Sequence, residues 1–243
     1  MKIRFFFIAL ILMFTSQSFP QLNKVLNKAD YPFWLYLPAD SIMKSNPPVL
    51  IFLHGKSLSG NNLNNVRRYG VINAIEKRLN MPAIVIAPQI RRGQSWIPSR
   101  VLSTLKYVMK NYNIDTNRIY VAGMSLGGSG TYLFASKYPK LIAAAVAMCG
   151  RGNSADMCNL ATLNLWIHHG KRDIDVPLSE SKKIVNAIKK CDKNANLKFT
   201  IHDNYGHREI ARLFYQDEIY DWLFKFRKNE KNSQIITDVK AVK

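Results

Sequence analysis

The chain has 243 residues, of which 35 are Lys or Arg and 16 are Asp or Glu, so its formal net charge is +19. Hydrophobic residues make up 47% of the chain and charged residues 21%, which excludes an intrinsically disordered or collagen-like protein. The length fits one domain that can bury a sizeable core. The positive charge raises the question of an anionic partner, which could be nucleic acid, an anionic surface or an acidic substrate.

The first 18 residues predict a signal peptide. Lys2 and Arg4 precede an unbroken apolar run, Phe5–Phe14, and the small residues Ser16 and Ser18 follow at the spacing that a signal peptidase needs. The run is too short to span a bilayer, which takes roughly 20 apolar residues. We therefore expect export to the periplasm or the extracellular space without stable membrane insertion. A retained interfacial anchor is the alternative.

Short apolar runs alternate with amphipathic stretches along the rest of the chain. Several of the runs are apolar throughout, as expected for strands covered on both faces of a parallel sheet. Strands are predicted at 33–37, 49–53, 83–87, 119–122, 143–148, 163–168 and 197–202, and helices at 101–111, 128–138, 179–190 and about 210–226. This order predicts an α/β fold with a mostly parallel central sheet, and chemistry in the loops at the carboxyl ends of its strands. The catalytic domain is expected over 19–228, followed by a loose tail over 229–243.

The segment Gly123-Met124-Ser125-Leu126-Gly127 follows a predicted strand and opens a predicted helix. This is the context of the nucleophile elbow, G-x-S-x-G, in which a tight turn lifts a serine hydroxyl above the sheet. Side chains at Gly123 and Gly127 would clash in such a turn, and the serine backbone is strained. The pattern predicts Ser125 as a nucleophile. The alternative is a Gly-rich turn that opens an ordinary helix.

A serine nucleophile needs a histidine base and an acid that orients it. In this kind of site both follow the serine along the chain, first the acid and then the histidine. His207 lies in the loop between the last predicted strand and the last predicted helix, whereas His54 precedes Ser125 in the chain. The other three histidines lie in or at the end of predicted strands, so His207 is the predicted base. Asp173 and Asp175 both lie in the loop after the strand at 163–168, and spacing alone does not separate them.

An oxyanion hole needs two backbone N–H groups aimed at the developing charge. We predict that one belongs to Leu126, directly after the nucleophile, and the other to Lys56 in the turn after the strand at 49–53. Gly55 permits that turn. The alternative is an ordinary turn without a catalytic role.

Three cysteines are present, so an oxidising compartment would allow one disulfide. Cys149 and Cys158 flank a short polar segment, and their pairing is the expected bridge; the alternative is three unpaired thiols. No CxxC pair or Cys/His set has the spacing of a zinc site, so no metal is expected.

Seven short motifs occur in a fixed order along the chain, at 52–55, 87–89 with Trp96, 115–120, 123–128, 166–177, 206–207 and 220–223. As an ordered set they resemble the secreted α/β-hydrolase esterases of the phospholipase/carboxylesterase-like and feruloyl-esterase-like group, some of which are labelled predicted peptidases. The resemblance covers roughly residues 30–228. It implies an α/β-hydrolase fold, Ser125 as nucleophile, His207 as base and an acyl-enzyme mechanism. In that group the segment HG-x-x-D-x-x-VP carries the catalytic acid, which implies Asp173 rather than Asp175.

These features predict a serine carboxylic-ester hydrolase that acts on esters of carbohydrates or on small carboxylic esters, without metal or organic cofactor. Arg91, Arg92 and Trp96 follow the end of a predicted strand and are candidate residues of a substrate rim that would favour an anionic ester. The alternative is an ordinary solvated basic surface. A serine peptidase or amidase with the same triad, and a non-catalytic basic binding module, remain as rival functions. The charges are scattered without a nucleic-acid motif, so no nucleic-acid partner is expected.

Overall fold

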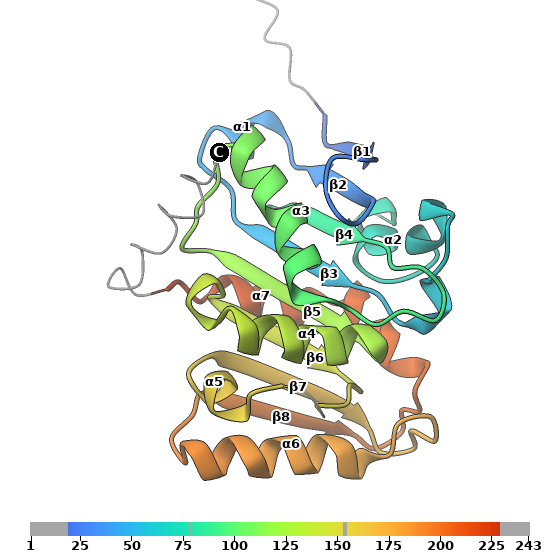
Figure 1. Cartoon of the computed structure of the whole chain (residues 1–243), viewed down its shortest axis with the longest axis vertical. Coiled ribbons are helices and arrows are strands. Elements are labelled where there is room, and N and C mark those ends of the chain that lie inside the picture. The colour runs from blue at the N-terminus through green and yellow to red at the C-terminus, as the bar shows by residue number, and fades with distance from the viewer. Residues whose placement is uncertain (1–18, 78, 153–154, 229–243) are drawn as a thin grey trace, which may run out of the picture.

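The computed structural model describes residues 19–77, 79–152 and 155–228; the predicted signal peptide and the predicted tail lie outside them. An eight-stranded sheet has the order β1-β2-β4-β3-β5-β6-β7-β8 (Figure 1). Only β2 runs opposite to its neighbours among these strands, and the other pairs are parallel. The strands are β1 (Gln21–Val25), β2 (Phe33–Leu37), β3 (Val49–Leu53), β4 (Ile84–Pro88), β5 (Ile119–Met124), β6 (Ala144–Met148), β7 (Asn164–Gly170) and β8 (Leu197–His202).

The central strands are apolar throughout because both of their faces are covered. In β3, Val49 and Ile51 belong to one core cluster, while Leu50 and Phe52 belong to the cluster on the opposite face. Side chains of a strand point alternately to the two faces, so a strand buried on both sides cannot show polar alternation.

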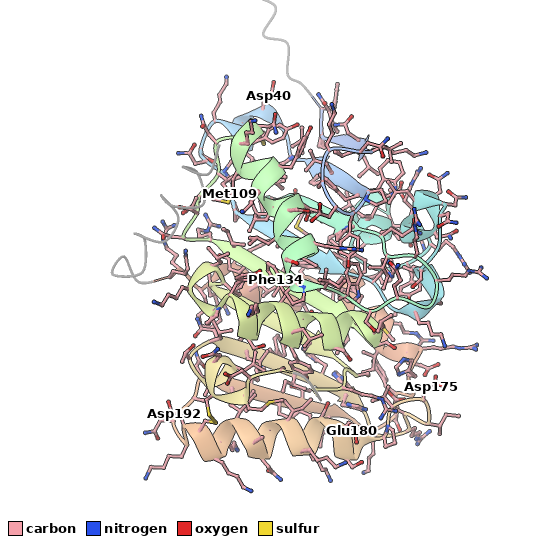
Figure 2. All side chains as sticks on the ribbon, in the orientation of Figure 1. Asp40, Met109, Phe134, Asp175, Glu180 and Asp192 are labelled. Atoms are coloured by element: carbon pink, nitrogen blue, oxygen red, sulfur yellow. A yellow bond between two sulfur atoms is a disulfide. The ribbon has the colours of Figure 1, made fainter. Side chains whose placement is uncertain are left out.

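Helices cover both faces of the sheet, with α3 to α6 on one side and α2 and α7 on the other (Figure 1). Figure 2 shows the same layering with all side chains, including Met109 of α3 and Phe134 of α4. The helices are α1 (Asp40–Met43), α2 (Val71–Glu76), α3 (Pro98–Asn111), α4 (Leu126–Lys137), α5 (Met157–Ala161), α6 (Leu178–Cys191) and α7 (Asp217–Phe224), with 3₁₀ helices η1 (Lys56–Leu58), η2 (Leu63–Arg67), η3 (Pro139–Leu141) and η4 (Glu209–Tyr215). Within the described ranges, no helix is long and apolar enough to span a bilayer.

The predicted α/β-hydrolase architecture is confirmed, and each predicted strand lies within two residues of an observed one. The prediction of one continuous helix over about 210–226 is wrong, because the chain forms η4, becomes extended at Gln216 and then starts α7. Ile210 and Leu213 are three residues apart and face the core in the 3₁₀ turn, which imitates the spacing of an α-helix. The edge strand β1 and the short helices α1, α2 and α5 were not predicted.

The expected disulfide between Cys149 and Cys158 is wrong. Cys158 pairs with Cys191 and joins α5 to the end of α6, while Cys149 is a free, buried thiol directly after β6. The Cys149 N–H donates to the carbonyl of His168 on the neighbouring strand, which anchors this residue in the sheet. Proximity in sequence favoured the wrong partner, because α6 returns beside α5 only once the sheet is assembled.

Loss of the Cys158–Cys191 bridge should destabilise the protein. The two residues are 33 apart, and a closed loop of that length typically contributes about 2–4 kcal/mol to the free energy of unfolding. We expect the midpoint of urea unfolding to shift to a lower urea concentration when reductant is added. The Cys158→Ser/Cys191→Ser variant should have the midpoint of the reduced protein both with and without reductant. A wild type that is insensitive to reductant would contradict the bridge.

Candidate active site

Ser125 lies in the turn between β5 and α4, with φ 60° and ψ −121°. Such a positive φ is strained for a residue with a side chain and persists only where the surroundings impose it. Two constraints impose it here. The Ser125 N–H donates to the carbonyl of Met148 at 2.8 Å, and a side chain on Gly127 would collide with the carbonyl of Leu53. The glycine therefore lets α4 approach β3 while the serine hydroxyl is lifted above the sheet.

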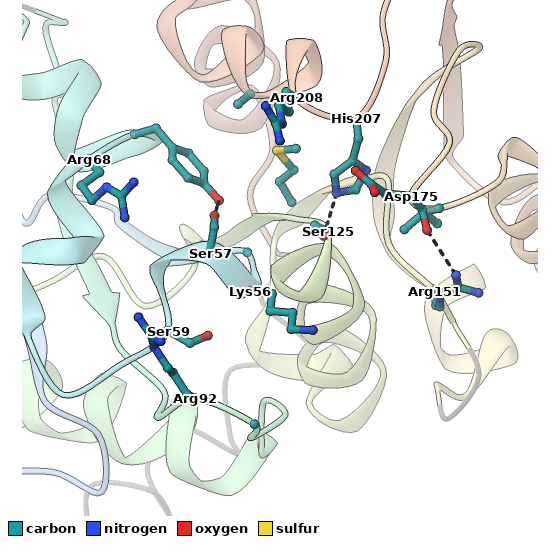
Figure 3. A pocket seen from close by; sticks show the side chains of 16 residues that line it. Lys56, Ser57, Ser59, Arg68, Arg92, Ser125, Arg151, Asp175, His207 and Arg208 are labelled. Carbon is teal, nitrogen blue, oxygen red and sulfur yellow. Dashed lines mark hydrogen bonds between the residues drawn. The ribbon is translucent and has the colours of Figure 1, made fainter.

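Three side chains from different loops form a continuous hydrogen-bonded chain. Ser125 Oγ lies 2.9 Å from His207 Nε2, and His207 Nδ1 lies 2.7 Å from Asp173 Oδ2 (Figure 3 shows the first contact). Asp173 follows β7 and His207 follows β8, so all three loops lie at the carboxyl edge of the sheet. Because a carboxylate only accepts, His207 donates through Nδ1, and Nε2 is left to accept the serine proton.

Asp173 is held in place by its own loop. Its Oδ1 accepts the N–H groups of Asp175 and Val176 at 3.0 and 2.8 Å, which leaves Oδ2 for His207. Burial acts to raise the pKa of Asp173, but the Val176 N–H and His207 outweigh it, so the pKa lies below its ordinary value. The side chain of Asp175 is exposed and forms no hydrogen bond with His207. The geometry thus separates the two carboxylates that sequence spacing left open.

A second buried histidine supports the acid loop. His169 Nε2 donates to the carbonyl of Val176 at 2.8 Å, and Nδ1 accepts from Ser181 Oγ at 2.7 Å. Burial lowers the pKa of His169, which keeps the ring neutral and consistent with these roles. Side-chain donor atoms of Cys149, His169 and Asp173 lie within 4.8 Å of one another, a spacing that a metal ion could use. Asp173 is already hydrogen-bonded to His207, and His169 to Val176, so this cluster is better explained as support for the acid than as a metal site.

Lys56 and Leu126, the predicted oxyanion donors, each open a helix beside Ser125. The first N–H groups of a helix have no acceptor within it and are free to point at an anion. Tyr69 was not predicted as a site residue. Its hydroxyl hydrogen-bonds Ser57 Oγ at 2.9 Å and packs against Gly55, where an added Cβ would lie 2.9 Å from it. No sequence motif identifies such a residue, because Tyr69 lies between η2 and α2 and reaches the site only in the folded chain.

His54 and Trp96 are structural residues under the site. The predicted rim position of Trp96 is wrong: its side chain is 3% exposed, packs edge-to-face on His54 and donates Nε1–H to the His54 carbonyl. Burial lowers the pKa of His54 to about 4, so the ring is neutral at pH 7. It donates to the Gly55 carbonyl and accepts from the Ile90 N–H, which ties the ends of β3 and β4 together.

A cavity of about 1160 Å³ opens above Ser125 and His207 (Figure 3). Of the two arginines predicted at a substrate rim, Arg92 lines this cavity, whereas Arg91 lines two adjoining hollows. The basic lining residues are Lys56, Arg68, Arg92, Arg151 and Arg208, whereas Asp175 is the one carboxylate among the residues that line it. Met124, Val176 and Ala211 supply an apolar portion near the serine.

Comparison with known proteins agrees with this architecture. A family model described as the dienelactone hydrolase family matches residues 74–213, more than half of the chain. The chain is 27% identical over 172 residues to a probable acetylxylan esterase A of Aspergillus clavatus, covering 62% of this chain and 54% of that protein. It therefore spans about half the length of this curated relative.

Among solved structures, the chain resembles a thermostable esterase with a TM-score of 0.73 and 23% identity, over 86% of this chain and 63% of that one. It also resembles a ferulic acid esterase with a TM-score of 0.65 and 16% identity, over 85% of this chain and 97% of that one. At these identities the likeness concerns the fold, and the resemblance to the α/β-hydrolase group found in the sequence is confirmed.

Proposed function

The chain belongs to the dienelactone hydrolase family, and from this premise we propose that it is a serine carboxylic-ester hydrolase acting on esters of carbohydrates or on small carboxylic esters. The observation that carries the proposal is the continuous chain of hydrogen bonds from Ser125 through His207 to the buried Asp173. A nucleophile, a base and an orienting acid in contact beneath an open cavity are the parts that acyl transfer needs.

In the proposed reaction, Ser125 Oγ adds to the ester carbonyl while His207 Nε2 accepts the hydroxyl proton. Asp173 holds the ring in the tautomer that makes this possible and stabilises the imidazolium. The negative charge on the carbonyl oxygen is stabilised by the N–H groups of Lys56 and Leu126. The C–O bond then breaks, and His207 protonates the departing alcohol. Water adds to the acyl-enzyme by the same route and releases the carboxylic acid and free Ser125.

Three observations support the substrate class and the compartment. Relatives named acetylxylan esterase and a structural neighbour named ferulic acid esterase act, by their names, on acetylated xylan and on esters of ferulic acid. The cavity is open, and its lining combines an apolar portion with the hydroxyl groups of Ser57, Ser59 and Tyr69, which suits a sugar bearing an ester. The exposed Cys158–Cys191 bridge supports the expectation of an oxidising compartment outside the cytosol.

A fluorophosphonate probe and a small substrate panel test this function. We expect stoichiometric labelling of Ser125, seen by peptide mass spectrometry, and turnover of acetyl, butyryl or feruloyl esters. A peptide amide in the same panel separates an esterase from a peptidase with the same triad. Labelling without turnover of any ester, or preferential cleavage of the amide, would contradict the proposal.

A further inference from the structure

We propose that the alcohol part of the substrate is an acidic polysaccharide whose sugars carry carboxylates, bound along a basic groove that leads away from Ser125. This inference rests on the proposed ester hydrolysis and names its substrate class. A glycan supplies the hydroxyl groups that an acyl ester requires, and sugar carboxylates supply charge that the groove can recognise.

The first observation is an excess of unpaired positive charge around the site. Among the residues lining the site cavity, Lys56, Arg68, Arg92 and Arg208 form no ion pair within residues 19–77, 79–152 and 155–228. Like charges gathered without counter-charges repel one another, and an anionic ligand relieves that repulsion. Figure 3 shows Arg68 and Arg92 on one side of Ser125 and Arg208 on another, so the charge surrounds the reacting hydroxyl.

The second observation is that the positive surface continues beyond the site. A smaller hollow of about 280 Å³ shares Arg92 with the site cavity. It also shares Gly60, Asn61 and Arg91 with a third hollow of about 630 Å³ that extends to Arg100. The three hollows therefore adjoin one another through common lining residues. An extended groove of this kind fits a polymer better than a compact small ester.

The outer groove is lined by positive charge like the cavity, and its lining is more polar. Arg91 and Arg100 have no carboxylate within ion-pair distance in the described ranges, and Asp30 is the one acidic residue that lines this hollow. Gln94 and Asn61 offer amide groups suited to sugar hydroxyls. The groove thus combines cations for carboxylates with neutral donors and acceptors for hydroxyls.

The floor of the groove is fixed before any ligand binds. Gln89 is 2% exposed, and its Nε2 donates to the carbonyls of Leu58 and Asn62 at 2.8 and 2.9 Å. The Gly60 N–H donates to the Ile90 carbonyl at 2.9 Å. These bonds tie the loop after β3 to the end of β4. A groove held in this way requires little ordering on binding, which favours affinity.

A polar group without a partner lies where the cavity meets the groove. Ser59 is 4% exposed and lines the site cavity, and its Oγ has no hydrogen-bond partner in the structure. A buried hydroxyl left unpaired costs free energy. Ser59 lies beside Arg92 in Figure 3, and its Oγ is closed to solvent, so a sugar bound there would contact it only after a neighbouring side chain moves.

The test compares two forms of one substrate, with its carboxyl groups either charged or neutralised. Acetylated oligogalacturonides are prepared with free carboxylates and, from the same batch, with those carboxylates methyl-esterified; acetate release is measured for each. We expect kcat/KM to be roughly 10-fold or more higher for the charged form at low salt, and the advantage to shrink at 0.5 M NaCl, because steering by a charged surface is screened.

Arg91→Ala/Arg92→Ala should clearly reduce the ratio of the two kcat/KM values, with the remainder due to the other cations of the cavity and groove. The control variant Lys189→Ala/Lys190→Ala removes the same amount of charge from the last turn of α6 and should keep the ratio. In Figure 2 this end of α6, near Asp192, lies opposite to the end near Glu180 and Asp175. Binding of non-acetylated oligogalacturonide to the Ser125→Ala variant, measured by calorimetry, gives a readout independent of turnover.

The outcomes separate this inference from the function on which it rests. Equal cleavage of both forms, equal loss of the ratio in the two double variants, or cleavage of p-nitrophenyl acetate but of neither oligosaccharide would overturn the acidic glycan and leave the esterase standing. Failure to cleave any ester would remove the proposed function and the inference with it. A ratio that depends on salt and on Arg91 and Arg92, with binding to the Ser125→Ala variant, would support both.

Discussion

Replacement of Ser125 by Ala is expected to reduce the kcat for p-nitrophenyl acetate by at least about 10⁴-fold, since the loss of a nucleophile leaves only binding and electrostatic assistance. Ser125 Oγ is the group in hydrogen-bond contact with His207, and no other described hydroxyl contacts that ring. Steady-state kinetics and fluorophosphonate labelling, which should disappear together, provide the measurement.

A serine elsewhere on the surface provides the matched control. Ser41 is exposed in the short helix α1, away from the residues that line the site cavity, so Ser41→Ala should keep both activity and labelling. Thermal unfolding of the Ser125→Ala variant should remain cooperative, which excludes misfolding as the cause. Substantial turnover by a folded Ser125→Ala protein would rule out this nucleophile.

The second large effect is expected at the acid. Asp173→Asn should lower kcat by about 10⁴-fold, because an amide NH₂ facing His207 Nδ1 favours the wrong tautomer of the ring. Asn can still accept the Val176 and Asp175 N–H groups through its remaining oxygen, so the loop should keep its shape. This substitution therefore changes the chemistry more than the fold, and circular dichroism and thermal unfolding can verify that.

Asp175→Asn is the natural comparison for this variant. It removes one charge from the same loop, but the Asp175 side chain forms no hydrogen bond with His207, and its backbone N–H still donates to Asp173. We expect less than about a tenfold change in kcat, on the scale of a lost surface interaction. If Asp175→Asn were the more damaging substitution, the two carboxylates would exchange their proposed roles.

The features that were predictable from sequence are those that depend on neighbours along the chain. The turn around Ser125 needs glycines two residues before and after it, so a short segment specifies it, and the observed φ of 60° fits that expectation. The strands were predictable for a similar reason, since runs such as β3 are apolar at every position. Such signals depend on neighbouring residues in the chain, so contacts between distant segments rarely change the structure that they specify.

The features that were missed depend on contacts between distant segments. Cys191 reaches Cys158 because α6 packs against α5, which spacing cannot reveal. Trp96 follows a strand end, as a rim residue would, yet its indole lies in the core against His54 and Tyr31. Tyr69 reaches the site from η2–α2 without any motif. Asp173 was selected over Asp175 by resemblance alone, because the hydrogen bonds that distinguish them form only in the folded loop.

The distribution of the cavity residues over separate loops has a consequence for how the specificity of this fold could diversify. Lys56 and Arg68 follow β3, Arg92 follows β4, Arg151 follows β6 and Arg208 follows β8, so the cations come from four different connections. Connections on the rim of a rigid sheet tolerate exchange and insertion better than the strands that carry them. A new substrate preference can therefore arise by replacing one loop at a time, while the sheet continues to hold the reacting groups in register.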